Sequence, residues 1–359
     1  MIIGLQGLEL GKDEAQFIVE NNIGGVILFS RNYESLEQLH KLITDVQRLR
    51  YKTEDKTPIF VSADMEGGRV QRFKDPFTVW PPFQKLGDLD SSSQCFNYTN
   101  MQGQELKAVG INMNYSPCVD VLFNEKNEVI GDRALSKDPE TVARLSSALV
   151  RGFIKAEVLA VAKHFPGHGY TTVDSHFDLP VDNRSLKEID ELGDLEPFKK
   201  VIKSRVPFLM TGHIQYPSID KDFPVTLSKI FLKDILRTSL RYRGLIMTDD
   251  LDMKALTKTY SVEEIPILAL NAGANVLLYC NEPDSPRLGI NSISKALSDK
   301  QVSSEDITAN AEAIVALKKR LLTQPVEPFS LDKVKSILGN KEHKQFAQDL
   351  AQGNLSPDA

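Results

Sequence analysis

Short apolar runs recur along the chain, and longer stretches with apolar residues at helical spacing separate them. Each run has four or five residues and is rich in Val, Ile and Leu, as is typical of strands that are buried on both faces. Eight such runs are present, at Ile2–Leu5, Gly25–Phe29, Ile59–Ala63, Gly110–Asn114, Val158–Ala162, Pro207–Thr211, Leu245–Thr248 and Asn275–Tyr279. The pattern therefore predicts eight strands.

Helices are predicted between the strands and after the last one, at Ser35–Arg50, Pro139–Ala156, Leu186–Ser204, Lys229–Leu240, Val262–Ala272, Glu305–Leu322 and Lys341–Gln352. Alternating strands and helices favour a parallel sheet. Eight such units favour an α/β fold in which the sheet closes into a TIM-type (β/α)8 barrel, and an open, doubly wound sheet is the alternative. No linker rich in Pro, Gly or Ser divides the chain. We predict one barrel domain over residues 1–325, followed by a C-terminal helical extension with a polar tail over residues 326–359.

Polar residues follow five successive predicted strands, from the third to the seventh. They are Asp64, Glu66, Arg69 and Arg72, then Asp120, then Lys163, His164, His168, Asp174 and His176, then His213, and finally Asp249 and Asp250. Because the active sites of barrel enzymes lie at the C-terminal ends of the strands, these residues predict the site. Asp249 follows the apolar segment Leu245–Met247 and is best placed to face the barrel mouth.

Four of the six histidines, His164, His168, His176 and His213, fall within one stretch of fifty residues. Imidazole titrates near neutral pH and suits proton transfer, so this cluster indicates catalysis. The other two, His40 and His343, occur in predicted helices, and we expect them on the surface.

Some of these residues also have a structural interpretation. Asp250 can cap the N-terminus of a helix. Pro166 prevents His164 and His168 from lying one turn apart on a helix, which weakens a helical metal motif. A metal-dependent barrel hydrolase nevertheless remains an alternative, and its ligands would be His164, His168, His213 and Asp249. A sugar-binding protein without catalysis is a second alternative.

Composition narrows the class of protein. With 41% apolar residues, 26% charged residues and a net charge of −6, the chain has the composition of a globular protein. Its charge disfavours nucleic acid and anionic membranes as partners. The three cysteines are far apart and lack metal-type spacing, and no secretory signal or membrane span is recognisable. We therefore expect a cytoplasmic monomer that needs no cofactor and no metal ion.

Longer motifs connect these residues. They are Gly24–Asn32, Asp64–Phe73, Lys163–Gly169 with Asp174–His176 and Leu179-Pro180, and Met247–Leu251, supported by Gly131–Arg133 and Pro224–Ser228. In these motifs the chain resembles the family 3 glycoside hydrolases, and more narrowly the single-domain bacterial β-N-acetylglucosaminidases of peptidoglycan recycling. The most specific motif is Lys-His-Phe-Pro-Gly-His-Gly followed by Asp-Ser-His. The resemblance extends from about residue 2 to about residue 325.

The resemblance implies a retaining exo-glycosidase that removes terminal β-linked N-acetylglucosamine, with GlcNAc-1,6-anhydro-MurNAc as substrate. It implies Asp249 as the nucleophile of a covalent intermediate and His176 as general acid/base, oriented by Asp174. The sugar-binding residues that it implies are Asp64, Arg72, Arg133, Lys163 and His164. One departure is Asn275, where relatives usually have Asp.

An Asp–His pair in place of the usual second carboxylate is chemically reasonable. Retaining glycosidases normally use two carboxylates about 5 Å apart, and by that rule Glu66 would be the acid. An imidazole needs only a small shift from about 6.5 to act at neutral pH, and when deprotonated it adds no negative charge beside Asp249. The resemblance therefore favours His176 as the general acid/base, and Glu66 is the alternative that the two-carboxylate rule gives.

Overall fold

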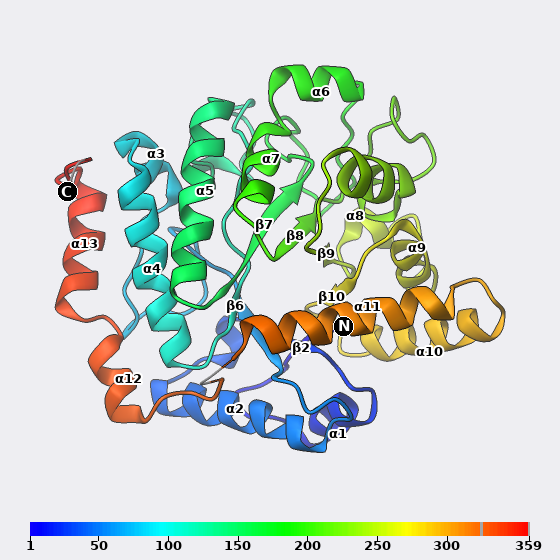
Figure 1. Ribbon diagram of the computed structural model, residues 1–359, viewed down its shortest axis with the longest axis horizontal. Helices are drawn as coiled ribbons and strands as arrows, with labels where there is room; N and C mark the ends of the chain where they lie inside the picture. Colours follow the sequence, from blue (N-terminus) through cyan, green and yellow to red (C-terminus); the bar gives the residue numbers. More distant parts are fainter. Residues whose placement is uncertain (324–325, 358–359) are drawn as a thin grey trace.

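Eight parallel strands form a closed barrel in the computed structural model of the protein, which describes residues 1–323 and 326–357 (Figure 1). In barrel order the strands are β1 (Ile2–Gly4), β2 (Gly25–Leu28), β3 (Phe60–Ala63), β6 (Met113–Asn114), β7 (Leu159–Phe165), β8 (Phe208–Thr211), β9 (Leu245–Asp250) and β10 (Val276–Tyr279). β1 pairs in parallel with both β2 and β10, which closes the barrel. All eight predicted strands and the TIM-type fold are confirmed, and the open sheet is wrong.

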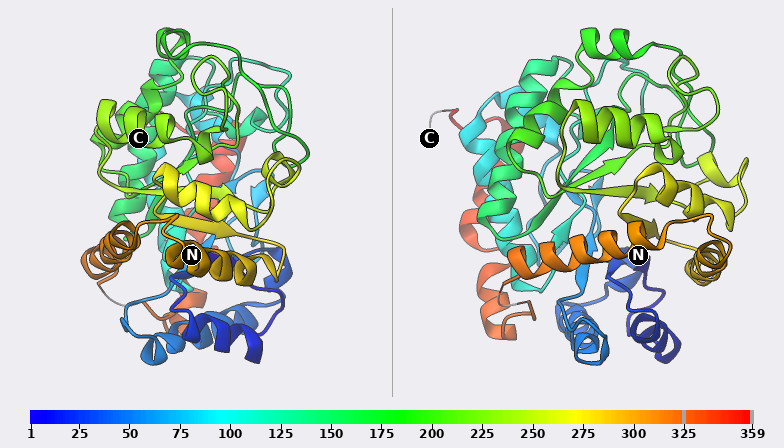
Figure 2. Two further views of the ribbon diagram at one scale, coloured as in Figure 1. Left: turned by 90° about the vertical axis from the view of Figure 1, so that its right-hand side faces the viewer. Right: turned by 45° about the vertical axis from the view of Figure 1, so that its right-hand side comes forward.

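Helices surround the barrel and connect consecutive strands (Figures 1 and 2). They are α1 (Lys12–Glu20), α2 (Leu36–Arg48), α3 (Phe83–Leu89), α4 (Ser92–Ala108), α5 (Pro139–Lys155), α6 (Leu186–Leu192), α7 (Glu196–Lys203), a wide π-type helix (Ile230–Ser239), α8 (Lys254–Thr257), α9 (Glu264–Ala272) and α10 (Ser285–Ser298). The single helix predicted at Leu186–Ser204 is wrong. Gly193 ends α6 in the left-handed region at φ 99°, where glycine has no steric cost, and α7 begins three residues later.

Alternation along the strands decides which side chains fill the barrel. In β9, Leu245 and Met247 belong to the cluster of apolar side chains inside the barrel, whereas Ile246 packs with the surrounding helices. In β7, Leu159 and Val161 point inward in the same way. Since successive side chains of a strand alternate between its faces, the next inward positions at the C-terminal ends are Asp249 and Lys163.

The N-terminal face of the barrel is closed by α11 (Ser304–Leu321), which crosses beneath the strands (Figure 2). Leu317 and Leu322 join the apolar cluster inside the barrel, together with Phe60 and Phe208. The rings of Phe60 and Phe208 meet edge to face with centroids 5.7 Å apart. Apolar side chains thus fill the barrel interior at its N-terminal end.

The C-terminal extension packs against α3 and α4 through α12 (Leu331–Ile337) and α13 (Lys341–Gln352) (Figure 1). Phe346 lies in an apolar cluster with Trp80. His343 is buried, and its Nδ1 atom lies 2.8 Å from Oε1 of Glu105 in α4. The expectation of a surface His343 is therefore wrong, because this buried carboxylate satisfies the ring. The domain boundary at residue 325 stays a prediction.

His40 is half-buried in α2, and its Nε2 atom lies 2.8 Å from the carbonyl oxygen of Phe329. It therefore holds the segment that leads to α12 rather than standing free on the surface. Within the described residues, none of the helices is long and apolar enough to cross a membrane.

Candidate active site

Three charged side chains extend the inward-facing rows of the third, fifth and seventh barrel strands. Asp64 follows β3, Lys163 lies in β7 and Asp249 lies in β9. The side chains of one layer in such a barrel come from alternate strands, so these residues share a layer at the C-terminal mouth. The structure thus brings together three of the residues that the sequence predicted for the site.

Lys163 bridges two carboxylates. Its Nζ atom lies 2.9 Å from Oδ1 of Asp64 and 2.7 Å from Oε1 of Glu66 in β4 (Met65–Gly67). β4 forms a hairpin with β5 (Val70–Gln71), which is followed by Arg72, and Nη2 of Arg72 donates to Oδ2 of Asp64 at 2.8 Å. Burial alone would raise the pKa of Asp64, but the charges of Lys163 and Arg72 outweigh it and hold the pKa well below its usual range.

Glu66 is held as an anion. The Nε and Nη2 atoms of Arg133 donate to its two carboxylate oxygens at 2.9 and 2.8 Å. Burial opposes ionisation of Glu66, but Arg133 and Lys163 outweigh it and lower the pKa to about 2. A carboxylic acid that has already lost its proton at neutral pH is unsuited to protonate a leaving group. The alternative of Glu66 as general acid is therefore disfavoured.

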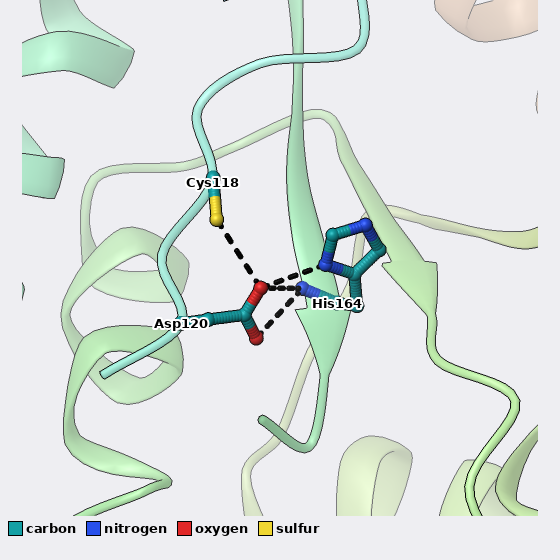
Figure 3. Close-up of side chains that lie close together, drawn as sticks. All are labelled: Cys118, Asp120 and His164. Atoms are coloured by element: carbon teal, nitrogen blue, oxygen red, sulfur yellow. Dashed lines mark hydrogen bonds and ion pairs between the residues drawn. The ribbon is translucent and has the colours of Figure 1, made fainter. Parts of the chain in front are cut away.

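Asp120 organises two of the clustered histidines (Figure 3). Its Oδ2 atom lies 2.7 Å from Nδ1 of His164, and the Sγ atom of Cys118 donates to the same oxygen at 3.2 Å. Oδ1 accepts the backbone N–H of His168 at 2.7 Å. These contacts fix the ring of His164, and within the described residues its Nε2 atom makes no hydrogen bond. The sequence placed Asp120 at a strand end, but its role required the fold.

The metal-dependent alternative is not supported by the donor arrangement. Within the described residues, the group whose possible ligand atoms come within 4.8 Å of one another is Cys118, Asp120 and His164, and it includes neither His213 nor Asp249. Hydrogen bonds within the protein already occupy the Asp120 carboxylate. The four proposed ligands are thus not assembled around one point.

A loop after β7 carries Asp174 and His176. The Nδ1 atom of His176 lies 2.7 Å from Oδ1 of Asp174, and the side chains are 64% and 35% exposed. Burial would raise the pKa of Asp174, but hydrogen bonds from the backbone and ring of His176 outweigh it and lower the pKa. The structure therefore brings together the pair that the sequence predicted.

His168 fastens this loop to the barrel. Its ring nitrogens lie 3.0 Å from Oγ1 of Thr171 and 3.3 Å from Oγ of Ser175. Burial, reinforced by the charge of His164, lowers the pKa of His168 to about 4. A neutral ring at this place both donates and accepts hydrogen bonds, which lets it hold the two hydroxyl groups.

Asp249 is half-buried, and its Oδ1 atom accepts the backbone N–H of Asp250 at 2.8 Å. Burial favours the neutral form of Asp249, but electrostatic interactions with the His164 and His213 rings, the hydrogen bond from the Asp250 backbone and the charge of Lys163 outweigh this effect and lower its pKa. Oδ2 of Asp249 accepts no hydrogen bond from the described residues. The site thus contains an ionised carboxylate with one oxygen available.

His213 is completely buried and contacts the backbone of the strand that carries Asp249. Its Nε2 atom lies 2.9 Å from the backbone oxygen of Asp250, and its Nδ1 atom lies 2.7 Å from Oγ1 of Thr226. A carbonyl oxygen can only accept, so Nε2 carries the proton. Burial lowers the pKa of His213. Both ring nitrogens are used, so His213 supports the end of β9 and has no nitrogen left for a metal ion.

Asp250 does not cap a helix, so that prediction is wrong. It is the last residue of β9, and its Oδ1 atom accepts the backbone N–H groups of Asp252 and Cys280, each at 3.1 Å. The helix that follows, α8, begins at Lys254. Because its side chain faces away from the barrel interior, Asp250 ties β9 to the end of β10 instead.

A TIM-type barrel whose C-terminal mouth gathers carboxylates, a lysine and histidines is the framework of an enzyme that acts on a polar substrate. Residues 4–317 match the model of the glycosyl hydrolase family 3 N terminal domain. A protein named beta-hexosaminidase from Hydrogenovibrio crunogenus is 37% identical over 295 residues, which cover 79% of this chain and 79% of the relative. The chain therefore belongs to glycosyl hydrolase family 3, and it is a glycoside hydrolase.

Solved structures agree with this assignment. A glycoside hydrolase family 3 beta-N-acetylglucosaminidase from a Paenibacillus species has a TM-score of 0.91 and 33% identity, over 98% of this chain and 67% of that chain. NagZ from Neisseria gonorrhoeae, in complex with N-trifluoroacetyl-D-glucosamine, has a TM-score of 0.77 and 30% identity, over 99% of this chain and 98% of that chain.

Proposed function

We propose that the protein is a retaining exo-β-N-acetylglucosaminidase with Asp249 as its nucleophile. The observation that carries this proposal is the position of Asp249. Its carboxylate extends the inward row of β9 at the barrel mouth and has a lowered pKa, and its Oδ2 atom accepts no hydrogen bond within the part of the chain that the structure describes. In the first step Oδ2 attacks the anomeric carbon and the glycosidic C–O bond breaks, which leaves a glycosyl ester on Asp249.

His176 is the proposed general acid/base, and Asp174 is its positioning residue. His176 donates a proton to the departing oxygen in the first step. In the second step it removes a proton from water, the water oxygen bonds to the anomeric carbon, and Asp249 leaves as a carboxylate. Asp174 holds the Nδ1–H of His176, as the orienting carboxylate does in a nucleophile–base–orienter triad. A loop that carries the acid/base can also exclude water when it closes.

The sugar is held by the charged groups around Asp64. We expect oxygens of Asp64 and nitrogens of Lys163 and His164 to contact the sugar, and Arg72 has a buried Nε atom without a hydrogen-bond partner among the described residues. Arg133 uses Nε, Nη1 and Nη2 once each for Glu66 and Val129. A guanidinium has five N–H groups, so two remain for sugar oxygens.

The relatives support N-acetylglucosamine as the sugar, since those compared are named beta-hexosaminidase or beta-N-acetylglucosaminidase. As natural substrate we propose GlcNAc-1,6-anhydro-MurNAc and its peptides, in cytoplasmic recycling of the cell wall. The resemblance of the whole site to single-domain bacterial enzymes supports this part of the proposal.

The decisive experiment compares a 4-nitrophenyl β-N-acetylglucosaminide with the matching β-glucoside, using wild type and Asp249→Ala. We expect hydrolysis of the first substrate only, and loss of turnover with retained fold in the variant. A 5-fluoro N-acetylglucosaminyl fluoride should label Asp249 and no other residue in a peptide map. A label elsewhere, or none because the acetamido group of the substrate acts as nucleophile, would overturn the assignment. GlcNAc-1,6-anhydro-MurNAc should be cleaved faster than chitobiose.

A further inference from the structure

A groove with a volume of about 1190 Å³ lies at the N-terminal face of the barrel, opposite the active site. It runs between α11 and the segments that lead into β7, β8 and β9. Figure 2 shows α11 crossing this face. The groove is larger than the ~300–1,000 Å³ usual for a small-molecule site, and none of the residues that hold the proposed substrate lines it.

The charge of the groove is opposite to that of the whole chain. Five of the fifteen arginines line it, namely Arg151, Arg205, Arg241, Arg243 and Arg320, against one acidic residue, Glu157. Glu157 forms an ion pair with Lys107. A chain with a net charge of −6 thus concentrates positive charge at one place away from its active site.

Among the described residues, these guanidinium groups have no carboxylate partners. The guanidinium groups of Arg205, Arg241, Arg243 and Arg320 make no ion pair or hydrogen bond within residues 1–323 and 326–357, and that of Arg151 donates only to the carbonyl oxygen of Ser147 in its own helix. Arginine cannot lose its proton in a protein. The groove therefore keeps its positive charge at neutral pH.

The floor of the groove is apolar. Ile154 of α5 and Leu321 of α11 are 45% and 36% exposed, and Ala313 and Ala316 of α11 also line the groove. Large exposed apolar side chains beside unpaired arginines are typical of protein interfaces, in which Arg is enriched and apolar anchors carry much of the affinity. An occupant should therefore present both carboxylates and apolar side chains.

The position of each arginine has a simpler explanation, but that explanation does not account for their gathering in one groove. Each lies near the C-terminal end of a helix, where the helix dipole favours a cation. The helix dipole explains why each single arginine is favoured at its position. It does not explain why several of them line one groove without acidic partners among the described residues. The same helix ends argue against phosphate, because phosphate sites typically use backbone N–H groups at helix N-termini, and the adjoining ends of α5, α7 and α11 are C-terminal.

We propose that this groove binds an acidic, leucine-type peptide segment of a partner protein, with the arginines pairing with its carboxylates and the apolar floor receiving its aliphatic side chains. Because the groove is separate from the proposed active site, the docked partner leaves the entry to the barrel mouth open. The proposal does not depend on which sugar the enzyme cleaves.

The test uses fluorescence anisotropy with a fluorescein-labelled peptide of Glu, Leu and Ser. One companion peptide replaces Glu with Gln, and another replaces Leu with Ser. The variant combines Arg205→Asn, Arg241→Asn and Arg243→Gln. Arg205 and Arg241 have φ of 60° and 56°, and Asn tolerates this left-handed region better than most residues, so the backbone is preserved.

We expect the Glu/Leu peptide to bind wild type more tightly than either companion, and its affinity to fall about tenfold or more in the triple variant. Lys56→Asn and Lys300→Asn are matched controls, because both lysines are exposed and have φ of 54° and 58° outside the groove. They should bind the peptide like wild type. All variants should keep wild-type glycosidase activity, which shows that they fold.

Equal binding by wild type and the triple variant would overturn the proposal, as would equal binding of the Gln peptide. Inorganic triphosphate that binds with the same arginine dependence, without binding of the peptide, would assign the groove to a phosphate ligand instead. Self-association that the triple substitution abolishes, measured by light scattering, would assign it to a second copy of the chain.

Discussion

The carboxylate of Asp174 holds His176 through two hydrogen bonds to one oxygen. Oδ1 of Asp174 lies 2.9 Å from the backbone nitrogen of His176 and 2.7 Å from its Nδ1 atom. The Nε2 atom of His176 makes no hydrogen bond to the described residues. The hydrogen bonds that orient this exposed ring come from its own loop, so the position of the ring follows that of the loop.

This arrangement predicts that the effect of His176→Ala depends on the leaving group. General acid catalysis contributes ~10²–10⁴-fold, so kcat for a disaccharide should fall by about that factor. A 2,4-dinitrophenyl glycoside needs little protonation of its leaving group, so its glycosylation rate should fall much less. Rapid-quench kinetics measures this step directly.

Asp174→Asn should give the same dependence on the leaving group, with a smaller loss. Asn keeps the size of Asp174 but removes its charge. A uniform loss on both substrates would mean that the loop has a structural role only. The matched control is Asp178→Asn, because Asp178 lies on the same loop and its carboxylate pairs instead with the exposed Lys258.

Glu66→Gln should cost stability, because it removes an anion from a buried cluster. Arg133 and Lys163 would then face one carboxylate fewer, and breaking a buried ion pair typically costs about 3–5 kcal/mol. Urea unfolding followed by tryptophan fluorescence measures the change. Glu125→Gln, which removes an exposed partner of Lys137, should leave the unfolding curve unchanged. Suppose that Glu66→Gln were as stable as wild type but failed to protonate the leaving group. The hypothesis that Glu66 is the general acid would then be supported again.

Asp250 predicts an unusual pH dependence of stability. Burial, aided by the charges of Asp252 and Asp249, raises its pKa from 3.8 to about 7. Between those values the folded state binds a proton that the unfolded state has released. The contribution of Asp250 to stability is therefore present at low pH and is lost as the pH rises toward 7.

Asp250→Asn should remove this loss. The unfolding free energy of the variant minus that of wild type should increase from pH 5 to pH 7, by an amount on the order of 1–3 kcal/mol. His168, with its pKa lowered to about 4, acts in the opposite sense in this window, and so the difference between the two proteins is the quantity to measure. Asp88→Asn, at an exposed position in α3, is the control. A flat difference would contradict the prediction.

The C-terminal extension should be required for a stable barrel. Glu105 accepts hydrogen bonds from Thr78 and from Gly339 as well as lying against the ring of His343. Truncation after residue 325 removes two of these three partners and exposes Trp80. We expect the truncated chain to aggregate or to unfold at a lower urea concentration.

His343→Ala isolates this contact. Loss of a partner for a buried carboxylate should cost about 1–3 kcal/mol, whereas the exposed Gln345→Ala on the same helix should cost much less. Wild-type stability of the truncated chain would show instead that residues 1–325 fold independently, as the sequence-based boundary implies.

The strands and the inward positions at their ends could be predicted because they depend on local patterns. Asp249 and Lys163 follow from the alternation of side chains along β9 and β7, which the sequence displays directly. The pairing of Glu66 with Arg133 could not be predicted, because these residues are 67 positions apart and meet only when the barrel closes. A general rule about two carboxylates favoured Glu66 as the acid, although its neighbours keep it ionised.

Helix α4 and the burial of His343 could not be predicted, because both involve polar residues that are buried. The inner face of α4 includes Gln94, Gln102 and Glu105, so its apolar periodicity is weak. His343 was expected on the surface because its partner lies 238 residues away. The net charge of a chain also does not show how its charged residues are distributed over the folded surface. The arginines of the groove come from separate elements between residues 151 and 320, and the fold alone gathers them.

Asn275 occupies a position where a carboxylate would pair with the neighbouring Arg237. Its Oδ1 atom accepts from Nη2 of Arg237 at 2.5 Å and from the backbone N–H of Ile246 at 2.8 Å. Burial lowers the pKa of Arg237, which indicates a guanidinium without a full counter-charge. Asp at this position would keep both contacts and add the missing charge.

Asn275→Asp should therefore stabilise the protein by about 1 kcal/mol at pH 7, because hydrogen bonds to charged groups are stronger than neutral ones. The side chain of Asn310 must turn, since Nδ2 of Asn275 now donates to its Oδ1 atom at 2.6 Å, and an Asp carboxylate needs its Nδ2 instead. The gain should vanish as the pH falls through the pKa of the new carboxyl group, because protonation removes the charge. Urea unfolding at pH 7 and at pH 3 measures both effects. A destabilised variant at pH 7 that Asn310→Ala restores would mean that Asn310 cannot turn, and the predicted sign of the change would then be wrong.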